Sequence, residues 1–130
     1  MSDVLVDSSV WIDFFRGDRE AVGRLDTLLE EGRVAVCGPV VAEVTSGART
    51  APTFQLLDEK LGSLTLLDEP AEVWRSVAEA RFALTRQGIQ AHLIDLLIAV
   101  TASAAGHLLL TRDRDFSAIA QVVPVETESF

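Results

Sequence analysis

The chain has 130 residues and a hydrophobic fraction of 48%, which suits a single cytoplasmic domain over residues 1–130. Its one cysteine and two histidines exclude an internal disulfide and the usual zinc-binding spacings. No apolar run approaches the roughly 20 residues that span a bilayer, and the first residues lack the pattern of a secretory signal. The net charge of −9 is unfavourable for binding phosphates, but it suits a domain that gathers carboxylates around a divalent metal.

The first part of the chain alternates short apolar strands with helices. We expect a strand at 4–7, then a serine-capped helix through 10–15, and an amphipathic helix at 22–29. A second strand is predicted at 33–38, and Pro39 suits the first turn of the helix that follows it.

The second part continues this alternation. The predicted elements are a helix at 52–61, a strand at 63–67, helices at about 70–87 and about 91–105, and strands at 107–111 and 122–125. Continuous apolar strands between helices indicate an α/β fold with a mostly parallel sheet covered on both faces. Sheets of this kind bind ligands beyond the carboxyl ends of their strands.

The segment "HLIDLLIAVTA" (92–102) contains one carboxylate, Asp95, in a run that is otherwise almost wholly apolar. No cation lies three or four residues from Asp95, and the helix is apolar on all sides, so we expect it to be buried. A buried, unpaired carboxylate is costly unless it is hydrogen-bonded, neutralised or bound to a cation. This pattern indicates a metal ligand.

Three further acids are expected at the same edge of the sheet as Asp95. Asp7 ends the first strand, Asp113 follows the strand at 107–111, and Glu43 lies near the start of the helix after the second strand. Two carboxylates about 4 Å apart repel by about 4 kcal/mol at an effective dielectric near 20, so such a cluster requires a cation. Oxygen ligands alone favour Mg²⁺ or Mn²⁺, and this arrangement suits hydrolysis of a phosphodiester.

Each acid also has a simpler interpretation. Asp7 is a candidate turn or cap residue, and Asp95 is a candidate cap for a helix that starts at Leu96. Asp113 is a candidate member of a charged turn, and the charge of Glu43 suits the dipole at the start of its helix. Their joint placement at one edge favours the metal site.

Other residue types near these acids have structural interpretations as well. Ser8, Ser9 and Thr111 suit caps and turns, although their hydroxyls are also placed to orient a metal-bound water. Trp11 and Trp74 are predicted to be core residues rather than platforms for stacked bases. Neither histidine has the partners of a catalytic triad.

Four segments in this order, "VLVDSSVWIDFFRG", "GPVVAEVTSGAR", "HLIDLLIAVTA" and "LLTRDRDF", closely resemble the PIN-domain ribonucleases, in particular the VapC toxins of type II toxin–antitoxin pairs. The resemblance covers nearly the whole chain and implies an α/β/α sandwich around a five-stranded parallel sheet. It implies metal-binding catalytic acids at Asp7, Glu43, Asp95 and Asp113, with Ser8 and Thr111 as polar neighbours and Asp115 as a supporting acid.

The resemblance also implies a metal-dependent endoribonuclease that uses Mg²⁺ or Mn²⁺, acts on structured RNA such as tRNA or rRNA, and forms a homodimer. The implied partner is a VapB antitoxin whose tail, often through an arginine, occupies the active-site groove. Four arginines next to the acidic motifs are candidates for a positive rim that binds substrate or antitoxin, or alternatively for ion pairs with neighbouring acids: Arg16, Arg49, Arg112 and Arg114.

Three other functions place acids at such an edge. A phosphorylatable receiver domain needs a lysine after a late strand, but Lys60 lies in a predicted helix before the strand at 63–67. A phosphatase with an aspartyl nucleophile needs a second aspartate two residues after Asp7, and that residue is Ser9. A non-catalytic module whose acids bind a metal or a basic peptide remains the alternative.

Overall fold

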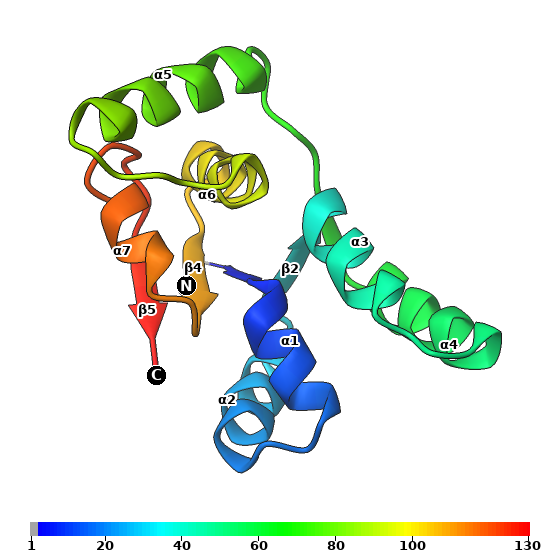
Figure 1. Ribbon diagram of the computed structural model, residues 1–130. Helices are drawn as coiled ribbons and strands as arrows, with labels where there is room; N and C mark the ends of the chain where they lie inside the picture. The colour runs from blue at the N-terminus through cyan, green and yellow to red at the C-terminus, as the bar shows by residue number, and fades with distance from the viewer. Residues whose placement is uncertain (1–2) are drawn as a thin grey trace.

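A computed structural model describes residues 3–130 (Figure 1). The strands are β1 (Val4–Val6), β2 (Val34–Cys37), β3 (Thr65–Leu67), β4 (Leu108–Thr111) and β5 (Thr127–Ser129). The helices are α1 (Ser8–Phe15), α2 (Arg19–Glu30), α3 (Gly38–Ser46), α4 (Ala51–Gly62), α5 (Val73–Arg86), α6 (Leu93–Ala105) and α7 (Asp115–Ile119). Among these, no helix is both long enough and apolar enough to cross a bilayer.

The five strands form one sheet in the order β3-β2-β1-β4-β5, and every pairing is parallel. The register pairs Val4 of β1 with Val34 of β2 and with Leu108 of β4, so β1 lies at the centre. Parallel strands joined by helices direct all their carboxyl ends to the same edge. The predicted α/β/α sandwich around a five-stranded sheet is confirmed.

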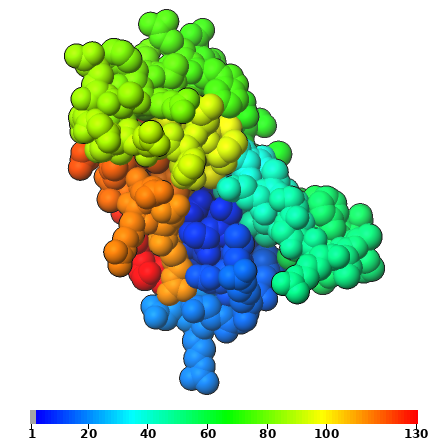
Figure 2. All heavy atoms as spheres, in the orientation of Figure 1, coloured from blue at the N-terminus to red at the C-terminus, as the bar shows by residue number. Residues whose placement is uncertain are grey.

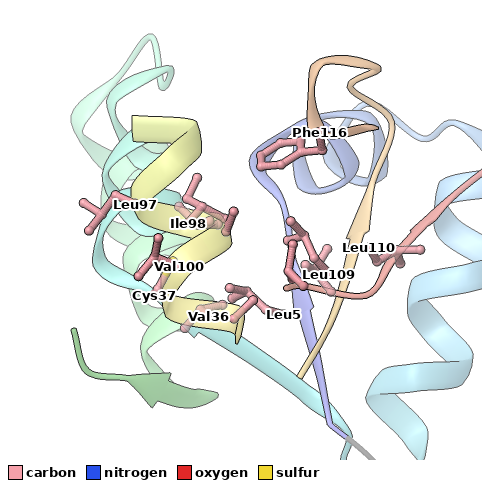
Figure 3. Packing of buried hydrophobic residues seen from close by; sticks show 14 of the residues in the cluster. Leu5, Val36, Cys37, Leu97, Ile98, Val100, Leu109, Leu110 and Phe116 are labelled. Atoms are coloured by element: carbon pink, nitrogen blue, oxygen red, sulfur yellow. The ribbon is translucent and has the colours of Figure 1, made fainter. Parts of the chain in front are cut away.

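The central strands are buried on both faces, which explains why their sequences are continuously apolar. All residues of β1 and β2 are buried, as are Leu109 and Leu110 of β4. On one side of these strands lies α6, whose Ile98 is wholly buried (Figure 3). This core fixes the direction of the strands and therefore the positions of the residues that follow them.

The ends of the helices follow from local sequence signals. Pro39 lies in the first turn of α3, where its missing N–H costs nothing, as the sequence predicts. Asp18 begins α2 by accepting a hydrogen bond from the amide of Ala21. Gly106 ends α6 with a φ of 69°, a conformation that glycine adopts without strain.

The structure corrects the predicted end of the chain. The segment 122–125 is not a strand: Val123 and Val125 fill the core, and Pro124 has no N–H to donate to a sheet. The fifth strand is instead the polar β5, whose Thr127 pairs with Leu109 of β4. The short helix α7 was not predicted, because five residues give too little periodicity.

The start of α6 is more exposed than its apolar sequence predicts. Leu93 and Ile94 are each 42% exposed, whereas residues 96–102 are buried. The prediction for the two tryptophans is right for Trp11, which is 2% exposed, and wrong for Trp74, which is 55% exposed on α5. Both corrections concern one face, formed by α5 and the start of α6.

Candidate metal centre

The four predicted acids come from segments that meet on one face of the molecule. Figure 2 shows these segments together: the start of α1 in blue, α3 in cyan, α6 in yellow and the residues before α7 in orange. Asp7 directly follows β1, Asp113 lies two residues beyond β4, and Asp95 is the third residue of α6. Glu43 is exposed and lies in the second turn of α3 rather than the first. The carboxyl edge of the sheet thus gathers all four.

Asp7 is the most deeply buried of these acids, with 3% of its surface exposed. It is the N-cap of α1, so the simpler interpretation of this residue as a cap is also correct. Its Oδ2 accepts hydrogen bonds from the Ser9 hydroxyl at 2.7 Å and from the Thr111 hydroxyl at 2.9 Å. All of these bonds use Oδ2, and none of the hydrogen bonds described for residues 3–130 involves Oδ1.

Ser9, rather than Ser8, supports Asp7. The Ser9 hydroxyl donates to Asp7 and accepts from the amide of Arg112 at 3.0 Å, whereas the Ser8 hydroxyl donates to Glu43 at 3.1 Å. The resemblance implied a role for Ser8 and none for Ser9. A signal was present, because an aspartate at the N-cap faces the second helical residue, which here is Ser9.

Asp115 lies closer to the centre of the site than its expected supporting role suggests. One carboxylate oxygen from each of Asp95, Asp113 and Asp115 lies within 4.8 Å of the others. Asp113 Oδ1 also accepts the amide of Asp115 at 2.9 Å, and the amide of Asp113 donates to the Thr111 hydroxyl at 2.9 Å. Backbone and hydroxyl hydrogen bonds therefore fix this turn, while the carboxylates converge.

The surroundings of Asp95 oppose its negative charge. Partial burial, followed by the charges of Asp113, Asp7 and Glu43, raises the pKa of Asp95 from 3.8 to about 6, and His92 opposes this only weakly. Among residues 3–130, no arginine or lysine forms an ion pair with Asp95, and no group donates a hydrogen bond to its carboxylate. The simpler interpretation as a cap is wrong, because α6 starts at Leu93 with His92 as its N-cap.

The donor set fits a hard divalent cation. The converging atoms are all carboxylate oxygens, which Mg²⁺ and Mn²⁺ prefer, and the charge of Asp95 is raised in energy by its burial and by the acids around it. Cys37 offers no competing soft ligand, because burial first and the charge of Asp7 next raise the pKa of its thiol to about 11. The arrangement is suited to holding a metal close to a water and a phosphate group.

The four arginines do not form one rim. Arg112 pairs with Asp13 at 3.0 Å and with Asp18 at 2.9 Å, so for Arg112 the ion-pair interpretation is correct. Arg16 and Arg49 line a groove of about 410 Å³ beside Glu43. Arg114 is exposed at the start of α7, next to the acids.

Comparisons with known proteins agree with this geometry. Residues 4–122 match the PIN domain family. The chain is 34% identical over 132 residues to Ribonuclease VapC11 of Mycobacterium tuberculosis and to VapC ribonuclease Mb1587 of Mycobacterium bovis, covering 98% of each protein and 98% of this chain.

Solved structures also match nearly end to end. A VapBC2 complex from Rickettsia felis bound to promoter DNA gives a TM-score of 0.80 at 21% identity, covering 98% of both chains. A toxin–antitoxin complex from Klebsiella pneumoniae gives 0.75 at 26% identity, covering 95% of this chain and 99% of that one. At 21% identity, the likeness to the complex from Rickettsia felis shows a shared fold and nothing beyond it.

Proposed function

The chain belongs to the PIN domain family, and from this premise we propose that it is a metal-dependent endoribonuclease and the toxin of a type II toxin–antitoxin pair. The single observation that carries the proposal is the convergence of Asp95, Asp113 and Asp115 beside the buried Asp7. The ribonuclease names of its relatives support RNA as the substrate, and RNA cleavage indicates a cytoplasmic role. The one sheet and one core of the described residues support a single domain.

Each site residue has a distinct task in this proposal. Asp95, Asp113 and Asp115 would hold Mg²⁺ or Mn²⁺, with Asp7 and Glu43 close enough for their charges to act on Asp95. When bound, the cation supplies an activated water and stabilises charge on the leaving oxygen. Ser9 and Thr111 keep the carboxylate of Asp7 in one orientation. Because these hydrogen bonds come from the protein itself, they lower the cost of orienting Asp7 in the site.

The chemistry predicts the ends of the products. The site contains no histidine pair to activate the RNA 2′-hydroxyl, since His92 is exposed at the start of α6 and His107 precedes β4 at the opposite edge. Attack by water should therefore leave 5′-phosphate and 3′-hydroxyl ends.

The proposal is tested with the purified protein and single-stranded RNA in EDTA, Mg²⁺ or Mn²⁺, followed by analysis of the product ends. Cleavage should require a divalent ion, and the products should be ligatable through a 5′-phosphate. Products with a 2′,3′-cyclic phosphate would contradict the mechanism. Metal binding without cleavage would favour the non-catalytic module.

The groove beside Glu43 supports inhibition by an antitoxin. Its walls carry the apolar side chains of Ile12, Phe15, Val44 and Leu57, while Arg16 and Arg49 lie at its edge. An amphipathic tail with an arginine fits this surface, because apolar residues match the walls and the guanidinium matches Glu43. The net charge of −9 favours the approach of a basic segment to the molecule as a whole, whereas the groove itself carries two arginines and one acid.

Expression of the protein alone should stop growth, and a small partner encoded nearby should restore it. Leu57→Glu, which changes a wall of the groove, should weaken this rescue. Leu56→Glu is the matched control, because Leu56 is 52% exposed and lies outside the lining. Normal growth of cells that contain folded, metal-replete protein without a partner would contradict the toxin assignment.

The face of α5 and the start of α6 supports a homodimer. Trp74, Phe82, Leu93 and Ile94 are exposed around one hollow of about 1000 Å³. Among the described residues that line the hollow there are Arg81 and His92 but no acid, which reduces repulsion between two acidic chains. Phe82→Ser should shift the protein towards a monomer in light scattering, whereas Phe54→Ser, at a 44% exposed site on α4, should not.

A further inference from the structure

Arg112 lies between two residues of the acid site, but its side chain is directed elsewhere. Thr111 on one side donates to Asp7, and Asp113 on the other contributes a carboxylate to the cluster. The Arg112 side chain is only 19% exposed and contacts none of the converging acids. Because the side chain is largely buried, contact with solvent does not explain its position.

The guanidinium joins this segment to the turn between α1 and α2. Its Nη1 donates to Asp13 Oδ2 at 3.0 Å and to Asp18 Oδ1 at 2.9 Å. Asp13 belongs to the second turn of α1, and Asp18 caps α2 through the amide of Ala21. One cation thus connects the end of one helix and the start of the next to the segment after β4.

The same guanidinium packs against Phe130, the residue after β5. Its central carbon lies 4.4 Å from the centre of the Phe130 ring, and Nε donates to the Phe130 main-chain oxygen at 3.4 Å. This contact continues the sheet register, in which Thr111 pairs with Ser129. The side chain is therefore held from two independent parts of the fold.

The backbone of Arg112 lies inside the acid site. Its amide donates to the Ser9 hydroxyl at 3.0 Å, and that hydroxyl donates to Asp7 Oδ2 at 2.7 Å. Only residues 112–114 separate the end of β4 from the start of α7, and they belong to neither element. A contact that fixes Arg112 therefore fixes Ser9, Thr111 and Asp113 relative to one another.

We propose that Arg112 is a positioning residue for the acid site. Contacts with Asp13, Asp18 and Phe130 anchor its side chain. This anchoring holds the segment 111–113 in the conformation that brings Asp113 and Asp7 together. The inference rests on the proposed metal-binding function and assigns Arg112 a role inside the protein rather than on a rim for RNA. Groups that hydrogen-bond metal ligands are worth about 10–100-fold in metal affinity, and Arg112 would support such groups through its own main chain.

Two measurements test this role in Arg112→Ala, Arg112→Lys and the matched control Arg75→Ala. Arg75 is an exposed arginine on α5 that pairs with Glu79 at 2.8 Å, so its loss also removes an ion pair but far from the acids. Calorimetric titration measures Mn²⁺ affinity, and hydrogen exchange of the amides of residues 113 and 115 without metal measures the order of the segment.

Arg112→Ala should bind Mn²⁺ about 10–100-fold more weakly and exchange these two amides faster, since both donate to side chains of this segment. Arg112→Lys should recover part of the affinity, because it keeps the charge but not the planar contact with Phe130. Arg75→Ala should match the wild type in both measurements. Wild-type affinity and exchange in folded Arg112→Ala would overturn the proposal.

If Arg112→Ala does not fold, Asp13→Ala removes one of the contacts and should show smaller changes in the same direction. Unchanged values would overturn the proposal. A higher KM for RNA with unchanged Mn²⁺ affinity would assign Arg112 to substrate binding instead. If the wild type binds Mn²⁺ but does not cleave RNA, the proposed function fails while this inference stands. If the wild type binds no Mn²⁺, unchanged exchange in the variant overturns the inference on its own.

Discussion

Asp7 and Asp95 lie at the same edge of the sheet, but the protein surrounds them differently. Asp7 is nearly wholly buried and accepts two hydroxyl hydrogen bonds, at 2.7 and 2.9 Å. Asp95 is half-buried and faces three other acids, and no described residue donates a hydrogen bond to its carboxylate. The protein therefore supplies hydrogen-bond donors to one oxygen of Asp7 but, among the described residues, none to the carboxylate of Asp95.

This difference separates the scaffold of the site from its metal-binding part. Ser9 and Thr111 supply hydrogen bonds that compensate for the burial of the Asp7 carboxylate. The carboxylates of Asp95, Asp113 and Asp115 repel one another, and a divalent cation bound between them would convert this repulsion into attraction. Changes on the two sides should consequently have different effects on activity, metal affinity and stability.

The largest effect is expected from changes on the Asp95 side. Asp95→Asn should reduce RNA cleavage by at least about 100-fold, since it removes a charged ligand, whereas loss of a supporting contact alone costs about 10–100-fold. Single-turnover cleavage at saturating Mn²⁺ measures this. Asp26→Asn, at an exposed position on α2, is the matched control and should retain activity. Equal activity of the two variants would remove Asp95 from the catalytic site.

Changes on the Asp7 side should have intermediate effects on metal binding and a clear effect on folding. Thr111→Val or Ser9→Ala should weaken Mn²⁺ binding by about 10–100-fold. Each should also lower the free energy of unfolding by about 1–3 kcal/mol, because Asp7 loses a donor in a buried place. Denaturant unfolding and calorimetry measure the two quantities. Ser8→Ala, whose hydroxyl contacts the exposed Glu43, should leave stability nearly unchanged; equal losses in all three variants would contradict the comparison.

The difference between the two sides also explains how much the sequence could predict. The strand order follows from buried apolar runs between helices, and the edge that collects Asp7, Glu43, Asp95 and Asp113 follows from parallel topology. These are properties of periodicity and chain direction, which a single sequence carries. The contact between Ser9 and Arg112 joins residues 103 positions apart, and no local pattern reveals it.

The remaining errors have related causes. The apolar character of "VVPV" correctly indicated burial but not a strand, because Pro124 prevents regular pairing. The exposure of Trp74 and Ile94 was missed because an exposed apolar face has the same composition as a core. For Arg112 the sequence indicated ion pairs but not their partners, because Asp13, Asp18 and Phe130 are brought together only by tertiary structure.

A smaller effect is expected in the pH dependence of the metal-free protein. The pKa of Asp95 is about 6 in the folded protein against an ordinary value of 3.8, so between these values the folded chain holds a proton that the unfolded chain releases. The bound proton on Asp95 stabilises the folded protein. This stabilisation is complete below about pH 4 and is lost as the pH rises through about 6. In EDTA, Asp95→Asn should therefore lose less Tm than the wild type over this range, by a few degrees at most because Asp95 is partly solvated. If Tm fell equally with pH in the wild type and the variant, burial and the neighbouring acids would not raise the pKa of Asp95.

The most direct test of the metal site is a set of thermal melts of the wild type and Asp95→Asn at pH 7, each in EDTA and in Mn²⁺. In EDTA the variant should melt at a higher temperature than the wild type, because an amide removes the repulsion from Asp113, Asp7 and Glu43. Mn²⁺ should raise the Tm of the wild type strongly and that of the variant much less. A variant that melts below the wild type in EDTA and keeps the full response to Mn²⁺ would contradict the assignment of Asp95 as a metal ligand.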